Sequence, residues 1–266
     1  MKNSRTYNVC GQTICITAAF IFMFPLVLML IRSFQTSGFG NYVQVFQTIN
    51  ILPNLMTSIV VVSGTLLIVA VVTSMAAFAF AKLEFKGKKL IYYLLLTGMM
   101  IPTSALIFPL YQIVKHLNLI NTPLSLILPY ATLNACFNLM ILKNYYDALP
   151  NEVIEAATID GASKRKVFSN IMLPIAKPGL AFVLIQTFLN AWNELQMGMI
   201  FINDTSKQPL SIVPLRFSQA LAAGVQGFPL EVMYAALVIC LLPIAIFYVF
   251  GSRFLIAGLT QGATKG

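Results

Sequence analysis

The sequence predicts an all-α fold, a polytopic membrane helical bundle with about six transmembrane helices. The first observation is composition. Of 266 residues, 58% are hydrophobic and only 9% are charged, whereas a soluble domain carries about 25% charged residues. So few charges cannot cover a water-facing surface, and the bilayer is expected to surround most of the chain. No polar linker divides the sequence, so we expect a single transmembrane domain over residues 1–266.

The second observation is the spacing of long apolar stretches. A spanning helix takes about 20 mainly apolar residues. The first stretch resembles a signal peptide in that Lys2 and Arg5 precede it, but no small-residue cleavage site follows, and we expect a span. Pro102 and Pro109 should kink the third stretch. The six predicted spans cover residues 13–31, 55–81, 90–114, 124–142, 180–202 and 233–250.

The third observation is the distribution of positive charge, which predicts orientation because Lys and Arg are retained on the cytosolic side. With the N-terminus inside, only four of the 17 Lys and Arg residues fall outside: Arg32, Lys115, Lys207 and Arg216. Both termini are therefore predicted to be cytoplasmic. The segment 144–178 is predicted to face the cytosol, and the segment 203–231 is predicted to be an external loop.

Charge and cysteine usage exclude several classes of function. A net charge of +9 would suggest nucleic acid in a soluble protein, but no basic stripe interleaves with aromatic residues, so we expect no nucleic-acid partner. Cys10, Cys15, Cys136 and Cys240 lack metal-ligand spacing. With His116 as the single histidine, we predict no metal site.

The predicted external loop is long for a simple connection and contains several Pro and Gly residues, Gly227 among them. Two interpretations stay open at this point. The loop is either a surface cap over the bundle, or a segment that contacts an external partner or the mouth of a pathway.

The predicted cytosolic segment 144–178 has the pattern of two short helices joined at a glycine. Pro150 suits a first helical turn. Gly161 follows Asp160 where a left-handed residue commonly ends a helix, and Ser163 can cap the next helix. Each helix is about 15 Å long, too short to cross a bilayer.

Two short helices between brief loops indicate a docking surface for a partner. The alternative is a helix pair that lies on the membrane. The basic run at residues 164–166 fits that alternative, but Glu152 and Glu155 in the first helix do not, because anionic lipids would repel them.

The same segment resembles a known family. Glu155-Ala156-Ala157, Gly161, Ile171 and Leu173-Pro174 fill every position of the EAA motif, E-A-A-x3-G-x9-I-x-L-P, of ABC-importer permease subunits. Residues 101–111, 118–122 and 191–194 are similar to binding-protein-dependent carbohydrate-uptake permeases, and residues 258–266 are similar to the tail of the maltose-type inner-membrane subunit. Together the similarities extend over most of residues 55–266.

The resemblance implies the function of a transmembrane permease subunit of an ATP-driven importer, located in a bacterial-type plasma (inner) membrane. It implies that a carbohydrate is delivered by an extracytoplasmic solute-binding protein. The other implied partners are a second homologous permease subunit and two ATP-binding subunits. The residues implied to couple to an ATP-binding subunit are Glu155, Ala156, Ala157, Asp160, Gly161, Ile171, Leu173 and Pro174.

The chain itself is expected to be no enzyme and to bind no cofactor, with ATP and Mg bound by the partner subunits. The sequence contains no G-x-x-x-x-G-K-[ST] stretch, which agrees with this expectation. The resemblance also implies, less directly, that the tail near Gln261 reaches the pair of ATP-binding subunits.

Polar residues inside the spans predict a translocation path, because such residues are costly in lipid and usually face the bundle interior. Amide and carboxylate groups near aromatic rings suit a hydroxylated ligand. The alternative is that they only join helices by hydrogen bonds. One helical face in the fifth span with Glu194 beside it, and a second face in the fourth span, supply the candidates Gln186, Asn190, Asn193, Glu194, Met197, Tyr130, Asn134 and Asn138.

Three other functions are alternatives to a carbohydrate permease. The first alternative is a permease of the same class for a non-sugar solute. A stand-alone channel or secondary carrier is disfavoured because no internal inverted repeat is found. A membrane enzyme with Glu194 as its acid lacks a second carboxylate or a histidine within a span.

Overall fold

The computed structural model describes the backbone of residues 2–225 and 229–263, and the side chains of residues 11–225, 229–249 and 251. Within these residues every regular element is a helix, which confirms the all-α prediction. The α-helices are α1 Lys2–Ser33, α2 Gly40–Thr48, α3 Ile51–Lys82, α4 Lys88–Thr97, α5 Thr103–His116, α6 Leu124–Asp147, α7 Glu152–Ile159, α8 Lys164–Val167, α9 Leu173–Ile175, α10 Lys177–Asn193, α11 Gln196–Phe201, α12 Val213–Ala222 and α13 Leu230–Ala263. Short helical turns are η1 Gly98–Met100, η2 Phe168–Met172 and η3 Leu210–Ile212.

Four helical stretches of the described chain are long and apolar enough to cross a membrane, and two bent helix pairs raise the number to as many as six. The four are Gly11–Ser33, Ile51–Lys82, Leu124–Asp147 and Leu230–Val249. The bent pairs are Lys88–Met100 with Thr103–His116, at 105°, and Lys164–Ile175 with Lys177–Asn193, at 75°. A multi-pass membrane bundle of about six spans is therefore confirmed.

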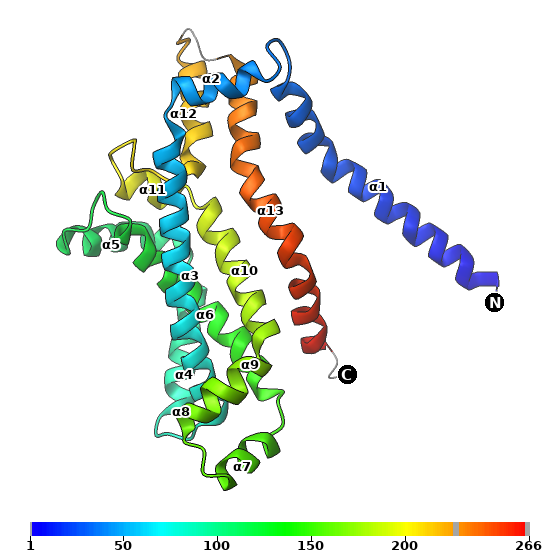
Figure 1. Cartoon of the computed structure of the whole chain (residues 1–266), viewed down its shortest axis with the longest axis vertical. Helices are drawn as coiled ribbons and strands as arrows, with labels where there is room; N and C mark the ends of the chain where they lie inside the picture. The colour runs from blue at the N-terminus through cyan, green and yellow to red at the C-terminus, as the bar shows by residue number, and fades with distance from the viewer. Residues whose placement is uncertain (1, 226–228, 264–266) are drawn as a thin grey trace. The chain divides into compact units, whose positions relative to one another are not determined.

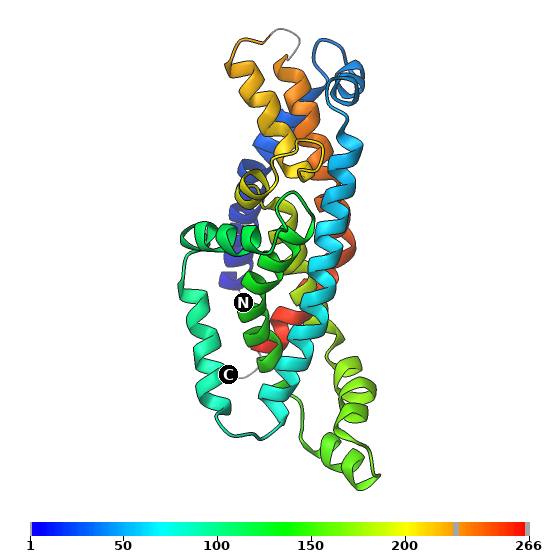
Figure 2. The same ribbon diagram turned by 90° about the vertical axis from the view of Figure 1, so that its left-hand side faces the viewer.

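The third predicted span is broken rather than kinked. The chain leaves the helix at Ile101, which has an extended backbone with ψ 120°, and Pro102 is also extended. A residue before proline is driven out of the helical conformation by the proline ring. Figure 2 shows α4 upright and α5 lying across it. Pro109, by contrast, is accommodated inside α5.

The prediction of one continuous fifth span over residues 180–202 is wrong. Helix α10 ends at Asn193, Glu194 is extended with φ −67° and ψ 130°, and α11 begins at Gln196. The helical face predicted for Gln186, Asn190, Asn193 and Met197 therefore ends at Asn193. The physical reason is that the Glu194 carboxylate accepts from the N–H groups of Met197 and Gly198 and so caps the first turn of α11.

The chain divides into two compact units, Met1–Ile51 with Val213–Leu242 and Leu52–Ile212 with Pro243–Gly266. The first, smaller unit holds α1, α2, α12 and the start of α13. Its turn from α1 to α2 is fixed by Asn41, whose Nδ2 donates to the carbonyls of Ser33 and Gln35 at 2.9 and 2.7 Å.

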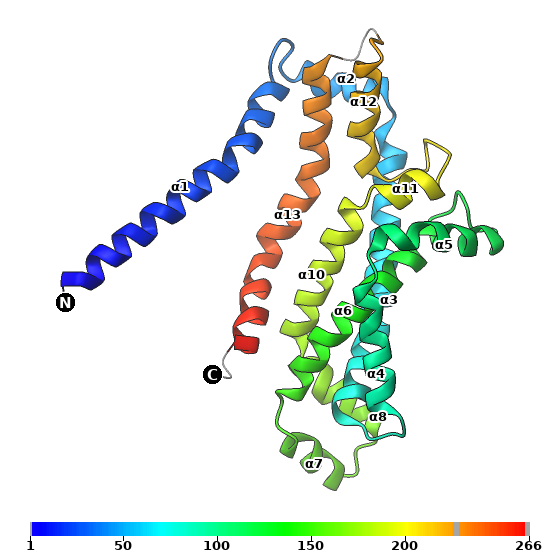
Figure 3. The same cartoon turned by 180° about the vertical axis from the view of Figure 1, so that it is seen from behind.

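The second, larger unit is organised around α3, α6 and α10, which run side by side in Figures 1 and 3. One buried cluster joins all three helices, with Phe78 from α3, Leu142 from α6 and Val183 from α10. Gly64 lets α3 approach α6 closely, because a Cβ atom there would lie 2.7 Å from Ile127 Cδ1. Close approach at small residues is typical of helix pairs in lipid.

The segment 144–178 has two helices, as predicted, at the lower end of the view in Figure 2. The first is α7, and the second is the helical stretch Lys164–Ile175 made of α8, η2 and α9, which continues through Leu173 and Pro174. Gly161 has φ +78°, and it ends α7 as a left-handed residue. The N–H of Ala162 donates to the carbonyl of Ala157 at 2.9 Å, which completes a Schellman-type end. Ser163 Oγ accepts from the N–H of Lys166 at 3.4 Å, so the predicted cap is confirmed.

The first part of the segment 203–231 is a cap on the larger unit. Backbone groups of residues 203–210 are bonded to side chains that precede α6 or lie on α3. The bonds are Asn54 Nδ2 to the carbonyls of Thr205 and Gln208, the N–H groups of Asn203 and Asp204 to Asn121 Oδ1, and the N–H of Leu210 to Ser58 Oγ. Of the two interpretations left open, the structure favours a cap for this part.

Further along, this segment forms α12 in the smaller unit, and α13 begins at Leu230. Residues 226–228, including Gly227, lie outside the described residues, as do residues 264–266 of the tail. The side chain of Gln261 is likewise outside the described part.

Asp204, in the segment 203–231, has an exposed carboxyl group and accepts two hydrogen bonds from Ser206. The bond from the Ser206 hydroxyl, and then the bond from its backbone N–H, lower the pKa of the Asp204 carboxyl below its usual value.

Candidate functional site

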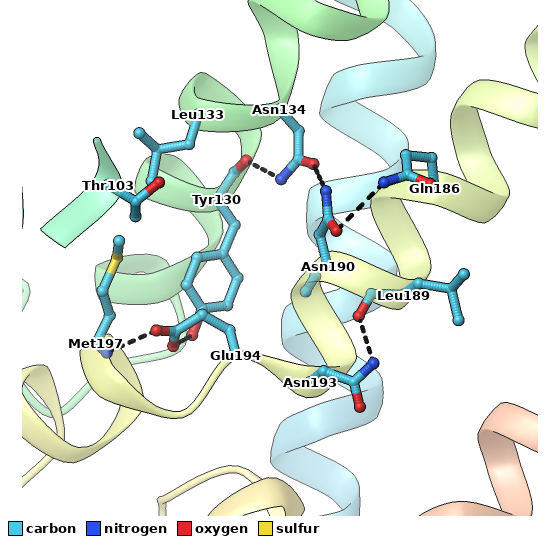
Figure 4. A pocket seen from close by; sticks show the side chains of 11 residues that line it. Thr103, Tyr130, Leu133, Asn134, Gln186, Leu189, Asn190, Asn193, Glu194 and Met197 are labelled. Atoms are coloured by element: carbon cyan, nitrogen blue, oxygen red, sulfur yellow. Dashed lines mark hydrogen bonds between the residues drawn. The ribbon is translucent and has the colours of Figure 1, made fainter. Parts of the chain in front are cut away.

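A polar cavity of about 590 Å³ lies between α6 and α10, with the start of α5 and α11 at its edge (Figure 4). Seven of the eight residues predicted for the translocation path line it: two from α6, three from α10, Glu194 from the break after α10, and Met197 from α11. Its lining is Thr103, Tyr130, Leu133, Asn134, Gln186, Leu189, Asn190, Ala191, Asn193, Glu194 and Met197.

One wall of the cavity is a chain of side-chain amides. Gln186 Nε2 donates to Asn190 Oδ1 at 3.5 Å, and Asn190 Nδ2 donates to Asn134 Oδ1 at 2.8 Å. Asn134 Nδ2 in turn donates to the carbonyl of Tyr130 at 2.8 Å. Each amide has two N–H donors and two acceptor lone pairs, so each keeps bonding capacity for a ligand in the cavity.

Asn193 is exposed at the end of α10, where its Nδ2 donates to the Leu189 carbonyl at 2.9 Å. Asn190 is also exposed, one turn earlier. Both amides therefore present polar atoms at the cavity surface. Their residue types and their spacing allow hydrogen bonds to the hydroxyl groups of a solute without a net charge.

Glu194 holds the break between α10 and α11. Its Oε1 accepts from the N–H of Met197 at 2.9 Å, and its Oε2 accepts from the N–H of Gly198 at 3.2 Å and from the Tyr130 hydroxyl. These N–H groups belong to the first turn of α11, and N–H groups in a first turn have no acceptor within the helix. The carboxylate supplies the missing acceptors, and it also ties α11 to α6.

Ser211 adds a further contact at the same place, because its Oγ donates to the Glu194 carbonyl at 2.8 Å. Both the side chain and the backbone of Glu194 are thus bonded within the larger unit. Discontinuous helices with polar groups at the break are typical of solute sites in transporters.

Two residues of this region lie away from the cavity. Asn138 is fully buried, and its Nδ2 donates to Thr187 Oγ1 at 2.8 Å, which joins α6 to α10. It has the helix-joining role that the sequence left open as the alternative. Trp192 is buried beside the ring of Phe188, with 5.5 Å between ring centroids, so Tyr130 is the aromatic residue of the cavity lining.

Several cavity residues escaped sequence reasoning, namely Thr103, Leu133, Leu189 and Ala191. Thr103 had a signal, since it directly follows the helix break at Pro102. The three apolar residues had none, because leucine and alanine occur on every face of a spanning helix.

The residues predicted to couple to an ATP-binding subunit do not all face one way. Glu155, Ala156, Asp160, Gly161 and Pro174 are exposed. Ala157 is buried, and Ile171 and Leu173 are partly buried. Ala157 and Ile171 belong to the same core as α3, α6 and α10, so these two positions brace the segment against the chain.

Ile159, which the sequence reasoning did not single out, is 86% exposed at the end of α7. Lys82 at the end of α3 fixes the other end of the segment, because its Nζ donates to the Leu149 carbonyl at 2.8 Å and to Asn151 Oδ1 at 2.7 Å.

A broken-span helical bundle with a polar cavity and an exposed, braced helix pair defines the class of a membrane permease. The chain belongs to the family described as binding-protein-dependent transport system inner membrane component, which matches residues 73–261. The resemblance found in the sequence is confirmed, and the chain is a multi-pass permease subunit of an ABC importer.

Curated relatives align along nearly the whole chain. The diacetylchitobiose uptake system permease protein NgcG of Streptomyces coelicolor is 29% identical, over 99% of this chain and 91% of the relative. The trehalose/maltose transport system permease protein MalG of Thermococcus litoralis is 32% identical, over 94% of each. A chain from a bacterial ABC transporter involved in the import of alginate has the same fold, with a TM-score of 0.81 and 18% identity over 95% of this chain and 98% of that one.

Proposed function

We propose that this subunit passes a carbohydrate through the cavity between α6 and α10. The observation that carries the proposal is the amide wall formed by Gln186, Asn190 and Asn134 beside the break at Glu194. Neutral donors and acceptors match the hydroxyl groups of a sugar. The names of the two relatives, which are those of sugar systems, support the same solute class.

The size of the cavity also supports a sugar-sized solute. Its volume of about 590 Å³ lies within the usual range for small-molecule sites, about 300–1,000 Å³. The lining combines amides, one carboxylate and several apolar side chains, so a solute meets both hydrogen-bonding groups and apolar surface. The Glu194 carboxylate already accepts three hydrogen bonds, so we assign it to holding the break rather than to binding the solute.

The segment 144–178 is proposed to dock one ATP-binding subunit on the cytosolic side, with both termini on that side. Glu155, Ala156 and Ile159 form the exposed contact surface. Ala157 lies in a core shared with α3, α6 and α10, and Lys82 ties the segment to α3. A displacement of the docked subunit is therefore passed to the helices that line the cavity.

The remaining partners follow from the same proposal. A second homologous permease completes the path, an extracytoplasmic solute-binding protein delivers the solute, and ATP and Mg are bound by the two ATP-binding subunits. This chain supplies the path and the coupling, and the energy comes from its partners.

Uptake measurements with cavity variants test the proposed solute class. In cells, Asn190→Ala and Asn134→Ala should raise the KM for uptake of the transported sugar about tenfold, since one lost hydrogen bond in a partly dry site costs about 1–1.5 kcal/mol. Thr132→Ala is the matched control and should leave the KM unchanged, because Thr132 is exposed on α6 and its hydroxyl donates to the Leu128 carbonyl of the same helix. Unchanged KM in both cavity variants, or uptake of a non-sugar solute only, would contradict the proposal.

A further inference from the structure

A second cavity, of about 260 Å³, lies where α3 ends, α4 begins and α6 approaches its end. It is separate from the cavity of the proposed solute path and shares none of its lining residues. Figure 3 shows α4 beside α3 and α6 at this place. Its lining is Phe80, Ala81, Lys88, Lys89, Tyr92, Tyr93, Lys143 and Asp147.

The lining of this cavity is basic, with three lysines against the single carboxylate of Asp147. The side chains of Lys88 and Lys143 are only 20% and 19% exposed. Two lysine side chains are thus packed largely against the protein at one place. Three lysines against one carboxylate leave an excess of positive charge at the cavity, which attracts an anion.

The carboxylates near these lysines neutralise their charge only in part. Glu84, which pairs with Lys88 at 3.0 Å, has a 91% exposed side chain, and such a pair contributes little. Lys143 pairs with Asp147 at 2.5 Å and lies 5.1 Å from the centre of the Tyr92 ring. Among the described residues Lys89 lines the cavity without an ion pair. An excess of positive charge remains for a ligand.

The surface next to the cavity is apolar. Leu90, Ile91 and Leu94 of α4 are 66%, 43% and 61% exposed. Helix α4 is part of one of the two bent helix pairs that are long and apolar enough to cross a membrane, so these side chains suit contact with acyl chains. A basic cavity bordered by an exposed apolar helix face has the two parts of a lipid site, one for a headgroup and one for the chains.

We propose that this cavity binds the phosphodiester headgroup of an anionic membrane lipid, with Lys89 and Lys143 contacting the phosphate. A water molecule occupies about 30 Å³ in the liquid, so a cavity of about 260 Å³ has room for a phosphate and the atoms attached to it. The acyl chains lie along α4. This inference is independent of which solute the permease carries.

The experiment uses the full chain purified in detergent with whichever subunits accompany it, and counts bound lipid by native mass spectrometry. Phosphatidylglycerol should bind about 25-fold more tightly than phosphatidylcholine, because each of the two lysines favours an anionic lipid about fivefold at a membrane surface. The variant K89Q/K143Q should lose this preference, and K89R/K143R, which keeps both charges, should retain it. The control K115Q/K207Q changes two exposed lysines outside the cavity and should bind as the natural chain does.

Three results would overturn the inference. Equal phosphatidylglycerol binding by the natural chain and by K89Q/K143Q would show that Lys89 and Lys143 do not contact the lipid. Displacement of the lipid by excess glycerol 3-phosphate would indicate a site for a soluble phosphate compound instead. Loss of the ATP-binding subunits from K89Q/K143Q, with lipid binding unchanged, would indicate a protein contact at the cavity.

Discussion

The helix pair of residues 144–178 and the polar cavity are built in opposite ways. The helix pair is specified locally, since Gly161 and Ser163 define its turn through their immediate neighbours. The cavity is assembled from α6 and α10, whose contributing residues are more than fifty positions apart, as in the bond of Asn190 to Asn134. A single substitution at the turn of the helix pair should therefore abolish most of its function, whereas a single substitution in the cavity should reduce transport only in part.

The largest effect is expected at the turn of the helix pair. Gly161→Val places a β-branched residue at φ +78°, where a side chain costs about 1–2 kcal/mol or more. Helix α7 should lose its end, and sugar uptake should fall more than tenfold while the chain still inserts. Uptake and co-purification of the ATP-binding subunits are the measurements.

Gly38→Val is the matched control for that substitution, because Gly38 also has a positive φ, +57°, but lies in the turn between α1 and α2. Similar losses of subunit co-purification in both variants would indicate general misfolding. In that case the difference between a locally specified docking region and the rest of the chain would no longer stand.

A smaller effect is expected at the helix break beside the cavity. Glu194→Ala removes the acceptor of two backbone N–H groups in α11, and each unsatisfied group costs about 1–3 kcal/mol. Glu194→Gln keeps one carbonyl oxygen and should keep part of the uptake. The unfolding temperature of the purified chain should be highest for the natural chain, lower for Glu194→Gln and lowest for Glu194→Ala.

Gln196→Ala, an exposed substitution in the same short helix, serves as the control for Glu194 and should leave unfolding unchanged. If Glu194→Ala altered the KM for sugar without any change in stability, the carboxylate would be a solute contact rather than a cap. Glu194 would then be a solute-binding residue together with the amides of the cavity wall.

The smallest effect on transport is expected at Asn138. Its hydrogen bond to Thr187 is buried and away from the cavity, and such bonds in membrane bundles are worth about 0.6–2 kcal/mol. Asn138→Leu should lower the unfolding temperature and leave the KM for sugar unchanged, whereas Asn190→Ala should do the reverse. If Asn138→Leu changed the KM as much as Asn190→Ala does, Asn138 would also contribute to solute binding and would not only join α6 to α10.

The spans and the helix pair of residues 144–178 could be predicted from the sequence, because the patterns that specify them involve residues close together in the chain. Apolar length predicts the spans, and the capping residues predict the two helices joined at Gly161. The break at Glu194 was missed since residues 180–202 are apolar enough to continue as a helix, and the deciding bonds run from the Glu194 carboxylate to Tyr130 on another helix and to α11. The roles of Asn134 and Asn138, one turn apart on α6, were indistinguishable in sequence for a similar reason.

The sequence by itself determined the membrane class of this protein, its family and the form of the helix pair, because composition, motif spacing and capping depend only on nearby residues. Only the tertiary structure decided which polar groups share a cavity, that Ala157 faces the core while Ile159 is exposed, and that Lys89 and Lys143 meet at one place. These facts depend on how α3, α4, α6 and α10 pack. Burial and proximity between distant helices arise only when the chain has folded.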